Sequence, residues 1–166
     1  MLAPIYRVYE RRLLEHVRAF PVPRHIGLIL DGNRRFGRLN GLRHPDDIYM
    51  AGANKLDDLL DWCIDLEIPA ITLWVFSTEN LKRPAQEVTG ILAAVEKKLK
   101  SLAGDSQFHS RRIRVRAVGR LELLPPSTLA AVRAAEAATE GYTCMHLTVR
   151  MRSKHCLGNS SRIAKL

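Results

Sequence analysis

The sequence predicts an α/β protein whose mostly parallel sheet is flanked by helices. Apolar runs with strong β-propensity, at 25–30 and 70–76, alternate with segments whose apolar residues have helical spacing. Strands separated by helices of this length are typical of βαβ units with parallel strands. Asp31 follows the first of these strands and Ser77 follows the second. Because α/β sheets bind ligands at the carboxyl ends of their strands, we expect a site there.

The expected elements alternate along the whole chain. Helices are expected at 4–20, 46–66, 84–102 and 125–139. Strands are expected at 25–30, 70–76, 111–116 and 146–149. Prolines mark several boundaries, because proline interrupts a helix and is favoured in its first turn. The arginine-rich segment 32–45 and the segment 104–106 are expected to be loops.

Composition limits the partners of the chain. A length of 166 residues favours a single domain. The formal net charge of +9 favours anionic ligands or an acidic membrane surface. No run of eighteen apolar residues is present, and arginines occupy the N-terminal segment where a signal peptide would be apolar. We therefore expect a cytoplasmic protein, with peripheral membrane contact compatible with its charge. The three cysteines have neither zinc-site nor disulfide-framework spacing.

The segment Asp31-Gly32-Asn33-Arg34-Arg35 has the composition of a site for a metal-bound polyphosphate. Mg²⁺ usually takes one or two carboxylates together with substrate phosphates, which suits Asp31. Glycine allows the backbone to approach a phosphate closely, and arginines offer forked donors to phosphate oxygens. This motif predicts a diphosphate site at the end of the first strand.

A second motif, Phe76-Ser-Thr-Glu-Asn-Leu-Lys-Arg-Pro84, closes the next strand. Together the two motifs resemble those of the cis-prenyltransferases, the undecaprenyl-diphosphate synthase family. That family's first signature is a His, a hydrophobic strand and Asp-Gly-Asn-x-Arg, and its second is Phe-Ser-x-Glu-Asn, a variable pair and Arg-Pro. The resemblance runs in order from about Tyr6 to Val149 and includes Ala51-Gly-Ala53 between the motifs.

The resemblance implies condensation of isopentenyl diphosphate with an allylic diphosphate, forming cis double bonds and releasing pyrophosphate. It implies Mg²⁺ as cofactor, Asp31 as metal-binding catalytic residue, and Asn80 and Ser77 as the pair that positions the second substrate. The substrate-binding residues it implies are Gly32, Asn33, Arg34, Arg35, Phe36, Arg43 and Arg83. Tyr49 lies where the family often has a histidine. The branched side chain of Val75 predicts a product of short to medium length.

The last residues depart from the family pattern. The resemblance implies a Tyr-Gly-Gly-Arg continuation, a second diphosphate-binding motif and the contacts of a homodimer, and these elements are not visible here. We therefore expect a partial prenyltransferase domain at 1–149 and a basic divergent tail at 150–166, from a frameshifted or prematurely ended reading frame. If the remainder of the fold covers the sheet edge at 146–149, that edge is expected to be exposed.

Other functions remain open at this point. A catalytically inactive remnant, or a partner subunit, needs only the first half of the family fold. A basic nucleic-acid-binding domain accounts for the charge but not for Asp31 or for the Ser77–Asn80 motif, and aromatic residues are sparse. We therefore expect no nucleic acid partner. A P-loop or dinucleotide site is excluded because neither glycine-rich motif is present.

Overall fold

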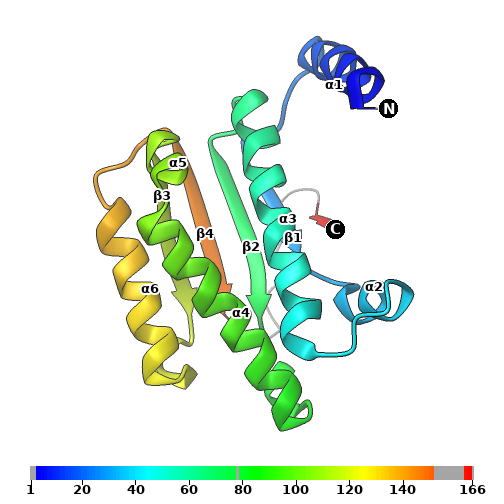
Figure 1. The fold of residues 1–166 in the computed structure, drawn as a ribbon. Helices are drawn as coiled ribbons and strands as arrows, with labels where there is room; N and C mark the ends of the chain where they lie inside the picture. Colours follow the sequence, from blue (N-terminus) through cyan, green and yellow to red (C-terminus); the bar gives the residue numbers. More distant parts are fainter. Residues whose placement is uncertain (1–2, 78, 152–162, 166) are drawn as a thin grey trace.

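The structure is a computed structural model that describes residues 3–77, 79–151 and 163–165. Its centre is a five-stranded sheet in which every pair of neighbouring strands is parallel, in the order β3-β4-β2-β1-β5. The strands are β1 (Ile26–Ile29), β2 (Ala70–Phe76), β3 (Ile113–Gly119), β4 (Met145–Met151) and β5 (Ile163–Lys165). The predicted α/β class is confirmed, and the carboxyl ends of β1 and β2 meet at one edge of the sheet (Figure 1).

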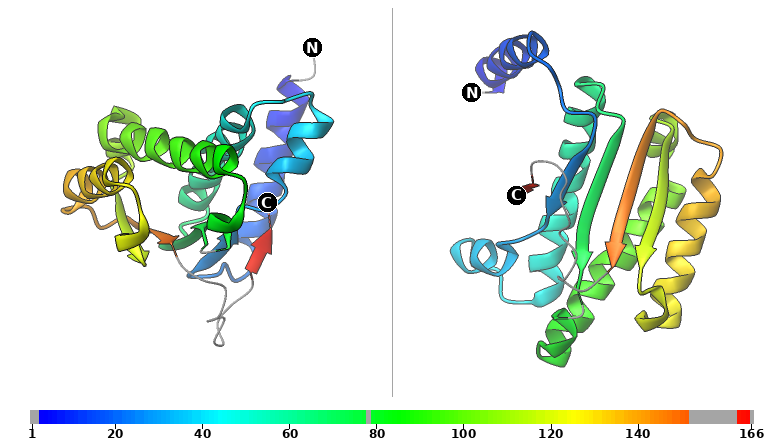
Figure 2. Two further views of the ribbon diagram at one scale, coloured as in Figure 1. Left: turned by 90° about the horizontal axis from the view of Figure 1, so that it is seen from below. Right: turned by 180° about the vertical axis from the view of Figure 1, so that it is seen from behind.

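Helices cover one face of this sheet. The α-helices are α1 (Ala3–Arg18), α2 (Asn33–Leu39), α3 (Pro45–Asp65), α4 (Ala85–Gly104), α5 (Ser106–Ser110) and α6 (Pro126–Thr139). Short 3₁₀ turns, η1 (Asn80–Lys82) and η2 (Leu121–Leu123), follow β2 and β3. Views from below and from behind show α3, α4 and α6 on the same side of the sheet (Figure 2). None of the described helices has both the length and the apolar character that a membrane span requires.

The alternation of the strands buries their apolar side chains beneath these helices. Ile71 on β2, Ile113 on β3 and Leu147 on β4 are fully buried, as is Leu60 on α3. Because successive strand residues point to opposite faces, a strand with this pattern offers one continuous apolar face to the helices. The core therefore fixes α3 and α4 above β2 and leaves their first turns at the carboxyl edge of the sheet.

Two expected loops contain helices. Segment 32–45 holds α2, and α4 extends to Gly104 before α5 begins at Ser106. The sequence of α2 has an internal glycine and three arginines, so it carries no apolar periodicity. Its stability comes from packing on α3: a Cβ at Gly37 would lie 2.6 Å from Ile48 Cγ1. The interpretation of 32–45 as a loop was wrong because this tertiary contact leaves no mark on local periodicity.

The expectation of an exposed edge at the fourth strand was also wrong. β4 lies inside the sheet, paired with β2 on one side and β3 on the other. Segment 163–165, within the expected tail, forms β5 and pairs with β1. β4 itself continues through Arg150 and Met151. The division of the chain at residue 149 remains a prediction.

Candidate functional site

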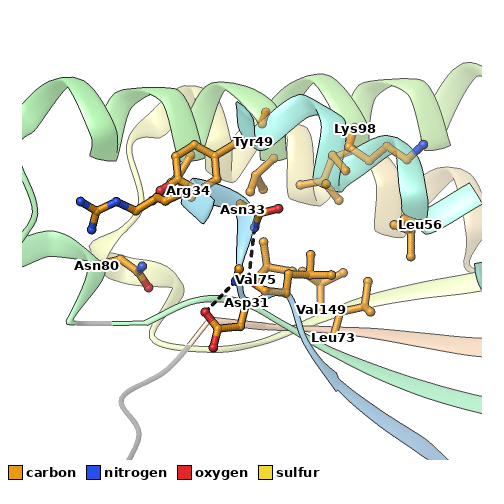
Figure 3. Close-up of a pocket in the computed structure, with 18 of the residues that line it drawn as sticks. Asp31, Asn33, Arg34, Tyr49, Leu56, Leu73, Val75, Asn80, Lys98 and Val149 are labelled. Atoms are coloured by element: carbon orange, nitrogen blue, oxygen red, sulfur yellow. Dashed lines mark hydrogen bonds between the residues drawn. The ribbon is translucent and has the colours of Figure 1, made fainter. Parts of the chain in front are cut away.

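A cavity of about 660 Å³ opens at the carboxyl ends of β1 and β2 and continues between the sheet and helices α3 and α4 (Figure 3). Its polar end is formed by Asp31, Gly32, Asn33, Arg34, Arg35, Arg38, Tyr49, Asn80 and Arg83. Its apolar end is lined by Leu56, Leu73, Val75, Ile91, Ala94, Val95, Leu99, Leu102 and Val149, with Lys98 among them. The cavity therefore suits a ligand with an anionic head and a hydrocarbon tail.

The turn after β1 presents Asp31 at the polar end. Gly32 has φ 89°, a left-handed conformation that costs glycine little, and it precedes α2 directly. Its N–H donates to Asp31 Oδ1 at 2.7 Å, while Asn33 Nδ2 donates to the carbonyl of Leu30 at 3.3 Å. A Cβ at Gly52 of α3 would overlap Asn33 Oδ1, so the Ala-Gly-Ala segment gives the turn its room.

The turn after β2 holds Asn80 in one orientation. Its Oδ1 accepts hydrogen bonds from the Ser77 backbone N–H and from the Ser77 hydroxyl, both at 2.7 Å. Both bonds use the amide oxygen, so the donor end of the same amide, Nδ2, is the group that Asn80 can offer to a ligand. Asn80 lines the cavity and Ser77 does not. Ser77 therefore fixes the orientation of the Asn80 amide.

Four side chains around the polar end of the cavity, each from a different segment of the chain, form what we call the Glu87 network: Glu87, Tyr49, Arg83 and Arg34. Glu87 Oε1 accepts from the Tyr49 hydroxyl at 2.5 Å and from Arg83 Nη1 at 2.9 Å. Arg83 Nη1 also donates to the Tyr49 hydroxyl oxygen at 3.0 Å, and Arg34 Nε lies 3.6 Å from Glu87 Oε1. One carboxylate thus orients two arginines from different elements toward the cavity.

These contacts fix the protonation states of the network. Burial and the neighbouring Glu87 carboxylate raise the pKa of Tyr49 to about 12, so the phenol is neutral and donates at physiological pH. Burial alone would raise the pKa of Glu87, but the hydrogen bonds from Tyr49 and Arg83, together with the charge of Arg34, outweigh it. The pKa of Glu87 is therefore lowered, and its carboxylate remains charged.

The structure brings most of the predicted site residues together. Asp31, Gly32, Asn33, Arg34, Arg35, Asn80 and Arg83 all line the cavity, as does Val75. Phe36 and Arg43 are not among the lining residues, and the Phe36 side chain is 51% exposed.

Sequence reasoning did not assign Arg38, Glu87 or Lys98 to the site. One feature of the sequence could have indicated the contact of Glu87 with Arg83: the two residues are four apart, the spacing of an ion pair on a helix. Lys98 lies within a helix whose apolar residues have helical spacing. A lysine in such a helix is ordinarily expected on the solvent side, so the sequence offered no reason to place Lys98 at a cavity.

Asp31 is the side chain that suits a divalent cation. The described residues contain no group of three or more His, Cys, Asp or Glu side chains placed to hold a metal ion. A single carboxylate beside a cluster of arginines matches Mg²⁺ that is bound jointly by the protein and by substrate phosphates. The donor set therefore fits a cation that arrives with a diphosphate and not one held by the protein alone.

The fold and the cavity define a class of protein: an α/β protein whose cavity is rich in arginine at one end and apolar at the other. Residues 29–154 match the prenyltransferase family model described as undecaprenyl diphosphate synthase. The chain is 46% identical, over 148 residues, to the tritrans,polycis-undecaprenyl-diphosphate synthase (geranylgeranyl-diphosphate specific) of Methanopyrus kandleri. The chain belongs to this prenyltransferase family.

Other comparisons agree on the family and the fold. The chain is 42% identical over 137 residues to the (2Z,6E)-farnesyl diphosphate synthase of Thermobifida fusca. A crystal structure of lavandulyl diphosphate synthase from Lavandula x intermedia, in complex with dimethylallyl diphosphate, shares the fold with a TM-score of 0.68 at 24% identity. That match covers 78% of this chain and 54% of the other.

The chain spans about half the length of the curated relatives it matches. The Methanopyrus kandleri match covers 89% of this chain and 54% of the relative, and the Thermobifida fusca match covers 82% and 52%.

The charge of Glu87 makes a testable contribution to stability. A carboxyl whose pKa is lowered in the folded state stabilises the fold above its unfolded pKa of about 4.3, and this contribution is lost as the pH falls through the folded pKa. Glu87→Gln should therefore lower the free energy of unfolding near neutral pH, and the gap from the natural chain should narrow below about pH 4. Urea unfolding at several pH values measures this difference in the free energy of unfolding.

Glu140→Gln is the matched control, because Glu140 is exposed at the end of α6. A Glu87→Gln gap that stays constant between neutral and acidic pH would contradict a role for the carboxylate charge.

Proposed function

We propose that the chain provides a cis-prenyltransferase site. The reaction condenses isopentenyl diphosphate with an allylic diphosphate to give a cis-polyprenyl diphosphate of short to medium length. The observation that carries this proposal is the cavity itself, whose arginine-rich polar end adjoins a long apolar end in the family fold.

Related proteins support this choice of substrates. The Lavandula enzyme binds dimethylallyl diphosphate, and the two curated relatives are named for geranylgeranyl diphosphate specificity and for (2Z,6E)-farnesyl diphosphate synthesis. Each of these three proteins is therefore named for, or bound to, a compound in which a prenyl chain is joined to a diphosphate. In this chain the diphosphate would lie among Arg34, Arg35 and Arg38, and the prenyl chain beside Val75 and Leu99.

The residues of the β1 turn would act on the leaving diphosphate. Arg34, which Glu87 already orients, would stabilise negative charge most where it grows during bond cleavage, without reorganising at that moment. Mg²⁺, when bound through Asp31, would supply further positive charge to the departing oxygens. Gly32 leaves this turn open, since an added Cβ would have no atom within 4 Å but would be strained by the positive φ.

Asn80 and Arg83 would position isopentenyl diphosphate. Arg83 offers a guanidinium at the polar end, and Asn80 offers Nδ2 from an amide that Ser77 holds by two hydrogen bonds. A donor fixed in this way can orient the second substrate against the allylic carbon, and such orientation lowers the barrier by removing unproductive geometries.

Asp31 is the residue through which binding should depend on Mg²⁺. Asp31→Ala should remove the Mg²⁺-dependent part of the affinity for dimethylallyl diphosphate, because the cation loses its protein carboxylate. Isothermal titration calorimetry with and without Mg²⁺ measures the affinity for dimethylallyl diphosphate in the natural chain and in the variant. Asp58→Ala is the control, since Asp58 is exposed on α3 and pairs with Lys55 at the surface. Equal affinities with and without Mg²⁺ in the natural chain would contradict the assignment.

Asn80 should matter for turnover more than for affinity. The test uses an enzyme in which residues 1–149 of this chain replace the matching segment of the Methanopyrus kandleri relative. Asn80→Ala should lower its kcat about 10²-fold, the scale of a positioned group that assists proton transfer, with little change in KM. Ser77→Ala should show the same pattern to a smaller extent. A loss confined to KM would instead indicate simple ground-state binding.

A further inference from the structure

The hydroxyl of Tyr49 closes a triangle of hydrogen bonds at the polar end of the cavity. It donates to Glu87 Oε1 at 2.5 Å and accepts from Arg83 Nη1 at 3.0 Å, while Arg83 Nη1 also donates to the same Oε1 at 2.9 Å. Figure 3 shows Tyr49 on the same side of the view as Arg34 and Asn80.

This triangle uses the only proton that Tyr49 has to donate. A phenol carries one hydroxyl proton, and here that proton is directed at the Glu87 carboxylate. Burial and the neighbouring Glu87 raise the pKa of Tyr49 to about 12, so the proton remains in place at physiological pH. Tyr49 lines the cavity, but it acts on a bound anion through its neighbours and not as a hydrogen-bond donor of its own.

The triangle also holds one corner of the Arg83 guanidinium. Both contacts of this group use Nη1, so the edge formed by Nε and Nη2 keeps its N–H donors. Two N–H groups on one edge of a planar guanidinium form the fork that matches a phosphate group. The Arg83 side chain is 36% exposed and lines the cavity, which leaves this edge accessible to a ligand.

Two acceptors from different helices fix the guanidinium more firmly than one could. A single contact with Glu87 on α4 would let the planar group rotate about that contact. The second contact, with Tyr49 on α3, opposes this rotation. The Glu87 side chain is only 14% exposed, and hydrogen bonds shielded from water in this way are electrostatically stronger than those in bulk solvent.

The fork of Arg83 shares one turn of the backbone with the Asn80 amide. The Arg83 N–H donates to the Asn80 carbonyl at 3.1 Å, at the end of η1. Both side chains line the cavity, and Asn80 offers Nδ2 because its Oδ1 accepts from Ser77. Donors that belong to one rigid turn suit one ligand, which is the second substrate of the proposed reaction.

We propose that Tyr49 is a positioning residue for the second substrate, an inference that rests on the proposed function. Tyr49 holds the Arg83 guanidinium so that its Nε–Nη2 edge receives the diphosphate of isopentenyl diphosphate. A fork that is held before the ligand arrives loses less side-chain freedom on binding, and this raises the affinity. The allylic diphosphate, which would lie on the arginines of α2, depends much less on Tyr49.

Isothermal titration calorimetry on the 166-residue chain, in the presence of Mg²⁺, tests this role. Isopentenyl diphosphate is titrated into chain saturated with a non-hydrolysable analogue of dimethylallyl diphosphate, and the analogue is titrated separately. Tyr49→Phe should weaken the binding of isopentenyl diphosphate about tenfold or more, the scale of a lost hydrogen bond to a charged group. The affinity for the analogue should remain nearly unchanged.

A second substitution shows whether Tyr49 acts through the Arg83 guanidinium. Arg83→Lys keeps the charge but replaces the fork with an ammonium, which has no edge to orient. Tyr49→Phe should therefore have little further effect on isopentenyl diphosphate binding in the Arg83→Lys background, and this non-additivity is the expected result. Tyr142→Phe is the matched control, because its hydroxyl pairs with His109 outside the cavity, and it should change neither affinity.

Three outcomes would overturn the inference and leave the proposed function intact: an unchanged affinity for isopentenyl diphosphate in Tyr49→Phe, an equal loss of affinity for both ligands, or an equal loss in both Arg83 backgrounds. Binding of the allylic analogue alone by the natural chain would overturn the assignment of Arg83 to the second substrate, and this inference with it. Binding of neither ligand would overturn the proposed function itself.

Discussion

The hydrogen bonds and ion pairs of the Glu87 carboxylate are the constraint on which the polar end of the cavity depends. Glu87 on α4 holds the hydroxyl of Tyr49 on α3, the guanidinium of Arg83 after η1 and, at longer range, Arg34 at the start of α2. Without a shared anion, these arginines would repel each other across the opening. With it, their remaining donors are directed at a ligand before that ligand arrives, which is the arrangement that electrostatic stabilisation of a leaving group requires.

Parallel pairing explains why this cluster adjoins an apolar cavity. The same β1–β2 register that brings Asp31 and Asn80 to one edge places Leu73 and Val75 beneath α3 and α4. Both helices begin at that edge and descend along the sheet, so each contributes polar residues in its first turns and apolar residues later. A single packing arrangement thus produces a cavity with a charged opening and an apolar interior.

The two motifs were sufficient to predict β1, β2, the family and most of the residues that meet at the polar end of the cavity. They succeed because Asp31 and Asn80 follow β-branched and aromatic runs whose period is local in sequence. α2 could not be predicted, since Gly37 and Ile48 stabilise it through a contact between separate elements. The Lys98–Asp57 pair is equally invisible to local patterning, because its partners are 41 residues apart. The two hydrogen bonds from Ser77 to Asn80 could not be read from the motif, and the role of Ser77 toward the second substrate remains a prediction.

The central claim is that one cavity binds the diphosphate at its charged end and the prenyl chain at its apolar end. A crystal structure of the chain with Mg²⁺ and a non-hydrolysable analogue of farnesyl diphosphate tests it most directly. The account predicts the diphosphate between Asp31 and the arginines of the polar end, with the prenyl chain running past Val75 toward Leu99. A diphosphate bound elsewhere, such as on the arginines of β3, or a prenyl chain left in solvent, would contradict it.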